Sequence, residues 1–228
     1  MDESSKTKRF YGSSFFEQFC IGHGIDVGCG RDIICKSAEP FDKIHGDANN
    51  ILKYKQEKSY DFVYSSHTLE HMIDPKKCIR DWFKLLKSGG YLIIIVPDSE
   101  LYEQGVFPSA FNPDHRWQFT MKCNLTGKNL ISIDKLLKEI NNYKLIAKKL
   151  QDYNYDYSLK SIGGKKIGIF TGKVLSKFIY GLKKYNTNLN PKFLKFISKF
   201  LHKTLTTRID QTLLFDAIAQ IQLIIQKP

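Results

Sequence analysis

A chain of 228 residues can bury one full core, and its 42% hydrophobic and 13% aromatic residues exclude a disordered protein. The longest apolar run, residues 91–97, is too short to cross a bilayer, and the charged N-terminus lacks a signal-peptide core. The net charge of +12 favours anionic partners over cationic ones. Five cysteines without a CxxC pair argue against a disulfide framework or a zinc ribbon, so we expect reduced thiols and a cytoplasmic protein.

The first 65 residues contain three short strand patterns. Residues 1–22 carry five aromatic side chains and are expected to be helical or irregular. Residues 24–28 form an apolar run that ends at glycine, residues 43–47 are a weaker candidate, and residues 60–65 alternate between apolar and polar side chains. We therefore expect three strands here.

A helix and a buried strand follow. Asp74 and Pro75 are typical of an N-cap and a first helical position, and we expect the helix to stop at Gly89-Gly90. The strand at 91–97 is apolar throughout, which is typical of a strand covered on both faces of a parallel sheet.

The second half continues the alternation. Residues 133–141 are predicted to be helical, residues 143–152 to form a strand, and residues 217–227 to form the last strand. Strands that alternate with helices predict an α/β layered fold with a mostly parallel sheet.

The segment 158–208 interrupts this scheme. It has no acidic residue but eleven lysines and one arginine, so it accounts for the whole net charge. Residues 190–205 are predicted to form a basic amphipathic helix with six apolar residues on or near one face: Phe193, Leu194, Phe196, Ile197, Phe200 and Leu201. Phosphates, acidic sugars and anionic lipid are suitable partners, although a lysine-rich composition alone explains the charge equally well.

The stretch GIDVGCGRD, residues 24–32, places two glycines at the first strand–helix turn. Ligands of open α/β sheets bind beyond the carboxyl ends of the strands, and glycine lets the backbone approach them closely. Ile33 stands where a dinucleotide site needs its third glycine, and no GK[ST] follows to make a P-loop. An acid two residues before the turn suits a cofactor without phosphate, such as S-adenosylmethionine.

Four segments in this order resemble class I S-adenosylmethionine-dependent methyltransferases: IDVGCG, GDA at 46–48, YDFVYSSHTLEHM at 60–72, and LLKSGG leading into YLIIIVPD at 91–98. Ser88 replaces the proline usual in LKPGG. Residues 102–120 and 210–228 are similar, more loosely, to the sugar O-methyltransferases of bacterial capsule and O-antigen pathways. The resemblance implies a Rossmann-like fold with an antiparallel terminal strand and S-adenosyl-L-methionine as cofactor.

The resemblance also implies one methyltransferase domain over 1–228. Its parts are a cofactor-binding core at 22–157, a basic helical insertion or cap at 158–208, and the terminal strand at 209–228. The insertion is expected to cap the substrate pocket or to contact a membrane surface through 190–205.

The cofactor residues that the resemblance implies are Asp26, Gly28, Cys29, Gly30, Asp47, Ala48, Ser65 and His67. Only 31 positions separate Gly30 from Asp61, so the second strand and its helix must be shortened. Asp47 is placed at the adenine, and either Asp42 or Glu39 at the ribose.

For the chemistry, a sugar hydroxyl is too weakly acidic to attack without a base, and histidine suits that task. His115 in NPDHRWQF is the first candidate, with Asp114 orienting it or sharing its role, and His67 is the second. Arg116 and Trp117 are expected substrate contacts for a phosphate or carboxylate and for a sugar face, together with Tyr102.

HTLEH, residues 67–71, also matches the HxxEH pattern of inverted zinc peptidases. We do not favour that interpretation, because the pattern follows a strand in a methyltransferase order and no third ligand is evident. The prediction is therefore no metal.

The predicted function is methyl transfer to a sugar hydroxyl of a nucleotide- or lipid-linked precursor in surface-polysaccharide biosynthesis. The partner is thus a small sugar substrate rather than nucleic acid. An RNA or protein methyltransferase that uses 158–208 is the alternative, and a subunit that only scaffolds assembly enzymes is a third.

Overall fold

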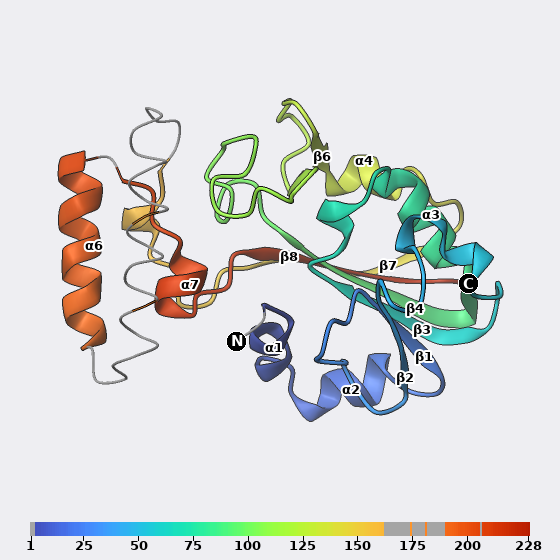
Figure 1. The fold of residues 1–228 in the computed structure, drawn as a ribbon. Helices are drawn as coiled ribbons and strands as arrows, with labels where there is room; N and C mark the ends of the chain where they lie inside the picture. Colours follow the sequence, from blue (N-terminus) through green and yellow to red (C-terminus); the bar gives the residue numbers. More distant parts are fainter. Residues whose placement is uncertain (1–2, 162–173, 175–180, 182–189, 206) are drawn as a thin grey trace.

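A six-stranded sheet in the order β2-β1-β3-β4-β8-β7 organises the chain in the computed structural model, which describes residues 3–161, 174, 181, 190–205 and 207–228 (Figure 1). The strands are β1 (Gly24–Val27), β2 (Ala38–Phe41), β3 (Tyr60–Ser66), β4 (Leu86–Pro97), β7 (Lys144–Gln151) and β8 (Gln220–Gln226), with β5 (Gln118–Thr120) and β6 (Leu130–Ser132) in a separate pair. The helices are α1 (Glu3–Arg9), α2 (Ser13–Phe19), α3 (Pro75–Lys84), α4 (Ile133–Leu137), α6 (Pro191–Leu205) and α7 (Gln211–Phe215), with 3-10 turns η1 (Ala48–Lys53), η2 (Leu69–His71) and η3 (Tyr157–Leu159).

The sheet is mostly parallel. β1 pairs in parallel with β2 and β3, and β3 pairs in parallel with β4, whereas β8 runs antiparallel to both of its neighbours, β4 and β7. This confirms the predicted Rossmann-like fold with an antiparallel terminal strand.

Both faces of the sheet are covered, as the continuous apolar run of β4 predicts. Leu92, Ile94 and Val96 belong to the core cluster under α3 and α4, while Ile93 and Ile95 pack with the aromatic side chains of α2 on the opposite face. Successive side chains of a strand point to opposite faces, so an uninterrupted apolar strand needs cover on both.

The second strand was predicted at the wrong place. It is residues 38–41, and residues 43–47 form a turn in which the amides of His45 and Gly46 donate to the carbonyl of Asp42. β2 is an edge strand, which explains why it tolerates Pro40 and why its sequence has no strand signature. A single short strand and η1 occupy the interval before β3, which confirms the expected shortening.

Helix α3 begins as predicted, with the carboxylate of Asp74 accepting from the amides of Lys76 and Lys77. It ends at Lys84, however, before the two glycines. Gly89 and Gly90 instead lie in an irregularity of β4, because Tyr60 pairs with Leu86 whereas Phe62 pairs with Tyr91.

Helix α6 lies beyond the end of β7 and β8, apart from the body of the sheet (Figure 1). The predicted single apolar face is divided: Leu194 is buried with Leu159 and Ile209, while Phe193, Phe196 and Phe200 are exposed. Contact of this helix with a membrane stays a prediction. Residues 162–173, 175–180, 182–189 and 206 of the predicted insertion lie outside the described residues.

All five cysteines are free thiols, as the sequence predicts. Among the described residues, no helix combines the length and the apolar character needed to cross a bilayer.

Candidate functional site

A cavity of about 870 Å³ opens at the carboxyl ends of the parallel strands. Ligand sites commonly measure roughly 300–1,000 Å³, so a cofactor and part of a substrate fit here. Its lining comes from the segments that follow β1, β2, β3 and β4: Gly28, Phe41, Asp42, Lys43, Gly46, Asp47, Ala48, Asn49, His67, Thr68, His71, Met72, Pro113, Asp114 and Arg116.

The turn after β1 is held by close packing against Thr68. Gly28 has φ +79, and a Cβ there would lie 1.9 Å from the Thr68 hydroxyl oxygen, which itself donates to the carbonyl of Val27. Gly30 also has a positive φ, but its missing Cβ faces open space. At Gly30, therefore, no side chain covers the backbone of the turn, and a ligand can approach it closely.

Asp26 lies beneath this turn and outside the cavity lining. Its carboxylate accepts a hydrogen bond of 2.7 Å from the amide of Ile34, which ties the far end of the loop to β1. Burial raises the pKa of Asp26 to about 7, against the opposing effects of that hydrogen bond and of Lys8. Asp26 thus stabilises the loop, and its contact with the cofactor stays a prediction.

This pKa predicts that Asp26 makes the protein less stable as pH rises. The folded state keeps the proton up to about pH 7, whereas an unfolded chain releases it near 3.8, so the free energy of unfolding falls between those values. At 1.36 kcal/mol per pKa unit, the fall is on the order of 4 kcal/mol. Asp26→Asn keeps the acceptor but removes the titration. We expect urea unfolding to show the variant gaining stability relative to wild type between pH 4.5 and pH 7.5, and an unchanged difference would contradict this assignment.

Of the two carboxylates predicted to bind the ribose, only that of Asp42 lines the cavity. Asp42 follows β2 directly, lines the cavity, and accepts from the amide of Gly30 at 2.7 Å. Glu39 is turned to Lys55 and to the hydroxyl of Tyr60, outside the cavity lining. Asp47 also lines the cavity and caps η1 by accepting from the amide of Asn49.

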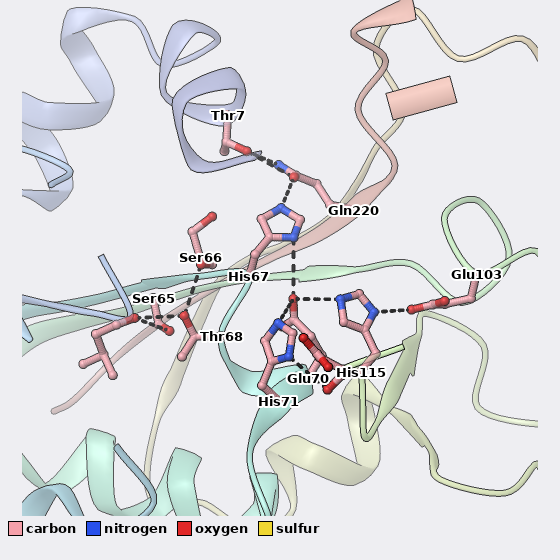
Figure 2. Close-up of polar contacts among 12 residues, drawn as sticks. Thr7, Ser65, Ser66, His67, Thr68, Glu70, His71, Glu103, His115 and Gln220 are labelled. Atoms are coloured by element: carbon pink, nitrogen blue, oxygen red, sulfur yellow. Dashed lines mark hydrogen bonds and ion pairs between the residues drawn. The ribbon is translucent and has the colours of Figure 1, made fainter. Parts of the chain in front are cut away.

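Three histidines surround one buried glutamate (Figure 2). Glu70 is 0% exposed, and its Oε1 lies 3.6 Å from His67 Nδ1, 3.9 Å from His71 Nε2 and 3.9 Å from His115 Nε2. Burial alone would raise the pKa of Glu70, but His67, His115 and His71 together hold it below its ordinary value. The HTLEH segment therefore forms one cluster with a histidine that lies 44 positions after His71.

His115 is oriented by Glu103 rather than by Asp114. Its Nδ1 lies 2.6 Å from Glu103 Oε1, and both side chains are buried (Figure 2). Asp114 is exposed on the cavity, and its backbone carbonyl accepts from His71 Nδ1 at 3.1 Å. The structure adds a histidine to part of the HTLEH segment: the ligand atoms of Glu70, His71 and His115 lie within 4.8 Å of one another, a group that leaves out His67.

The ring nitrogen of His67 that does not face Glu70 is hydrogen-bonded to Gln220 in β8. This atom, Nε2, lies 2.9 Å from Gln220 Oε1, and the amide of Gln220 donates to Thr7 (Figure 2). His67 has φ +54, a left-handed conformation that is unfavourable for a residue with a Cβ. Backbone strain of this kind concentrates at functional sites.

Of the remaining predicted residues, Ala48 and Arg116 line the cavity. Ser65 donates to the carbonyl of Val27, Cys29 is buried in the turn, and neither lines the cavity. Trp117 is partly buried against the core, and its indole donates to the carbonyl of Ile73.

Tyr102 is partly buried with its ring 5.5 Å from that of His115, so it contacts the cluster rather than the cavity. Glu103 and Gln220 were missed by sequence analysis, because nothing in their local sequence distinguishes them from surface residues. A buried acid beside a predicted base is visible only after folding.

Comparison with known proteins identifies a protein family that matches this chain. A model described as a methyltransferase domain matches residues 15–145, more than half of the chain. Similar solved structures include a SAM-dependent methyltransferase from Archaeoglobus fulgidus, 16% identical over 99% of this chain and 95% of that one with a TM-score of 0.47. The MccD protein is 13% identical over 95% of both chains with a TM-score of 0.49. The [4+2]-cyclase SpnF is 14% identical over 95% of this chain and 79% of that one with a TM-score of 0.45. Among curated proteins, none matches this sequence significantly.

Proposed function

Because the chain belongs to the methyltransferase-domain family and its cofactor is S-adenosyl-L-methionine, we propose that it methylates a sugar hydroxyl of a nucleotide- or lipid-linked precursor in surface-polysaccharide biosynthesis. The observation that carries this proposal is the histidine–glutamate cluster beside the cavity. Hydroxyl groups need help in losing a proton, whereas an amine nucleophile that is already neutral does not.

The cavity residues fit the cofactor. Asp42 offers a carboxylate as acceptor for the ribose hydroxyls, Asp47 and Ala48 offer a wall for the adenine, and the turn at Gly28, which has no side chain, leaves room for the amino-acid end. When bound, the cofactor supplies an electrophilic methyl group on a positively charged sulfur.

The chain's own task is alignment and removal of a proton. Holding the substrate hydroxyl in line with the methyl group can supply about 7–11 kcal/mol of the barrier, and help with the proton contributes roughly 10²–10⁴ in rate. His67 and His71 border the cavity, and His115 stands behind them with its orientation fixed by Glu103. We assign removal of the hydroxyl proton to this cluster.

Arg116 supports a phosphate-linked substrate. It is exposed, it lines the same cavity as His71 and Asp114, and its guanidinium forms the forked contacts that phosphate oxygens accept. The test is transfer of labelled methyl groups to a panel of nucleotide sugars. Transfer to RNA or protein instead, with RNA binding that weakens steeply with salt, would contradict the proposal and support the alternative.

Asp42 is expected to bind the cofactor. Asp42→Asn should weaken binding of S-adenosylmethionine about 10- to 100-fold, since a hydrogen bond to a charged group is worth about 1.5–3 kcal/mol. Glu39→Gln, three positions earlier and outside the cavity lining, is the matched control and should leave affinity unchanged. Isothermal titration calorimetry measures both, and equal effects of the two substitutions would contradict the assignment.

A further inference from the structure

The cluster of Glu70, His71 and His115 has the composition and placement of a metal site, and we infer that it binds one divalent transition-metal ion of the Zn²⁺ type. Each residue offers one ligand atom within 4.8 Å of the other two. Two imidazole nitrogens and one carboxylate oxygen form a donor set that suits Zn²⁺.

The Nδ1 atoms of His71 and His115, which point away from Glu70, make hydrogen bonds that determine which ring nitrogen carries the proton. The carbonyl of Asp114 accepts from His71 Nδ1, since a carbonyl cannot donate. The Glu103 carboxylate accepts in the same way from His115 Nδ1. In a neutral imidazole the other nitrogen then carries a lone pair, so the Nε2 lone pairs of both rings face the Glu70 carboxylate.

With both rings neutral, His71 and His115 bring no positive charge to Glu70. Neither oxygen of Glu70 makes a hydrogen bond within the described residues, although the side chain is fully buried, and its nearest nitrogen is His67 Nδ1 at 3.6 Å. Buried carboxylates are normally paired or coordinate a metal. An ion between the three ligand atoms supplies the missing partner for all of them at once.

The spacing favours an ion over direct hydrogen bonds. Each Nε2 lies 3.9 Å from Glu70 Oε1, too far for a charge-assisted hydrogen bond of about 2.7–2.9 Å. Ligands bound at about 2.0–2.1 Å in tetrahedral geometry lie roughly 3.3–3.4 Å apart. Each Nε2 therefore has to approach Glu70 Oε1 by about half an ångström, and no pair of ligand atoms starts more than 4.8 Å apart.

Support around the ligands matches that of established zinc sites. Histidine ligands usually donate their second ring nitrogen to a carboxylate or a backbone carbonyl, which fixes the tautomer. Here Glu103 does this for His115, and the carbonyl of Asp114 does it for His71. Glu103 is itself buried, so the orientation of His115 is set before any ion arrives.

One of the three ligands, His71, lines the cavity, so an ion bound here would be reached from the cavity. Three protein ligands with one open position are typical of catalytic rather than structural zinc. The role of the ion rests on the proposed function: it would lower the pKa of a substrate hydroxyl bound at the open position. That hydroxyl would then lose its proton more readily to His67, the histidine of the cluster that lines the cavity and is not a ligand.

Metal binding can be tested without substrate or cofactor. The full-length protein is freed of metal, titrated with Zn²⁺ by calorimetry, and analysed for bound zinc by mass spectrometry after gel filtration. Wild type should bind about one ion per chain. His71→Ala and His115→Ala should lose that binding, and Glu103→Gln should weaken it about 10- to 100-fold.

His23→Ala is the matched control, because His23 is an exposed histidine beside a different glutamate, Glu39. It should bind zinc as wild type does. Circular dichroism identifies any variant that fails to fold, and Glu103→Gln, which changes one atom, keeps the test open if the alanine variants unfold. No binding by wild type, or equal binding by wild type and by folded cluster variants, overturns the site. Zinc binding without methyl transfer to any sugar leaves the site standing and refutes only the proposed function.

Discussion

Gly28→Ala is expected to destabilise the protein by about 2–4 kcal/mol and to abolish cofactor binding, because it combines overpacking with a left-handed backbone. The new Cβ would lie 1.9 Å from the hydroxyl oxygen of Thr68 and 2.6 Å from its methyl carbon. Thr68 cannot move away easily, since it is buried and its hydroxyl is bonded to the carbonyl of Val27. The turn must therefore shift, and with it the wall of the cavity.

Gly89→Ala is a control that tests the left-handed backbone alone, without overpacking against a neighbouring side chain. Gly89 has φ +82, almost the value at Gly28, but nothing lies within 4 Å of the position of its missing Cβ. Its substitution should cost only the backbone term, about 1–2 kcal/mol, and should leave cofactor binding intact. Urea unfolding and calorimetry with S-adenosylmethionine measure both quantities. If the two variants lose equal stability, packing against Thr68 is not what requires glycine at residue 28.

His115→Ala is expected to lower turnover at least tenfold, up to about 10³-fold, with little change in cofactor affinity. His115 does not line the cavity, and its ring connects Glu103 to Glu70. Removing it leaves two buried carboxylates without that partner and disturbs the wall formed by His67 and His71. The loss should therefore fall on kcat and not on the dissociation constant of the cofactor.

Glu103→Gln tests whether His115 acts through its orientation. It keeps the volume of the side chain but weakens the bond to His115 Nδ1, so kcat should fall less than in His115→Ala. His23→Ala controls for the loss of an imidazole and should retain full turnover. An unchanged kcat in a folded His115→Ala protein would exclude the cluster from the chemistry.

Local sequence signals predicted much of the sheet. β1, β3, β7 and β8 lie where apolar alternation and glycine punctuation placed them, and α3 begins at its Asp-Pro cap. Those signals depend only on side chains a few positions apart, so they survive without knowledge of the fold. β2 was missed because an edge strand of four residues, one of them proline, has no such signal.

The sequence by itself also determined the glycine turn and the presence of histidines in the loops that follow the strands. Only the tertiary structure decided that Asp42 rather than Glu39 reaches the cavity, that Glu103 rather than Asp114 orients His115, and that His115 joins Glu70 and His71. These contacts join segments 12 to 45 positions apart, with that of Gln220 to His67 spanning 153. They form because burial forces charged side chains to find partners, and which partner is near depends on how the whole chain packs.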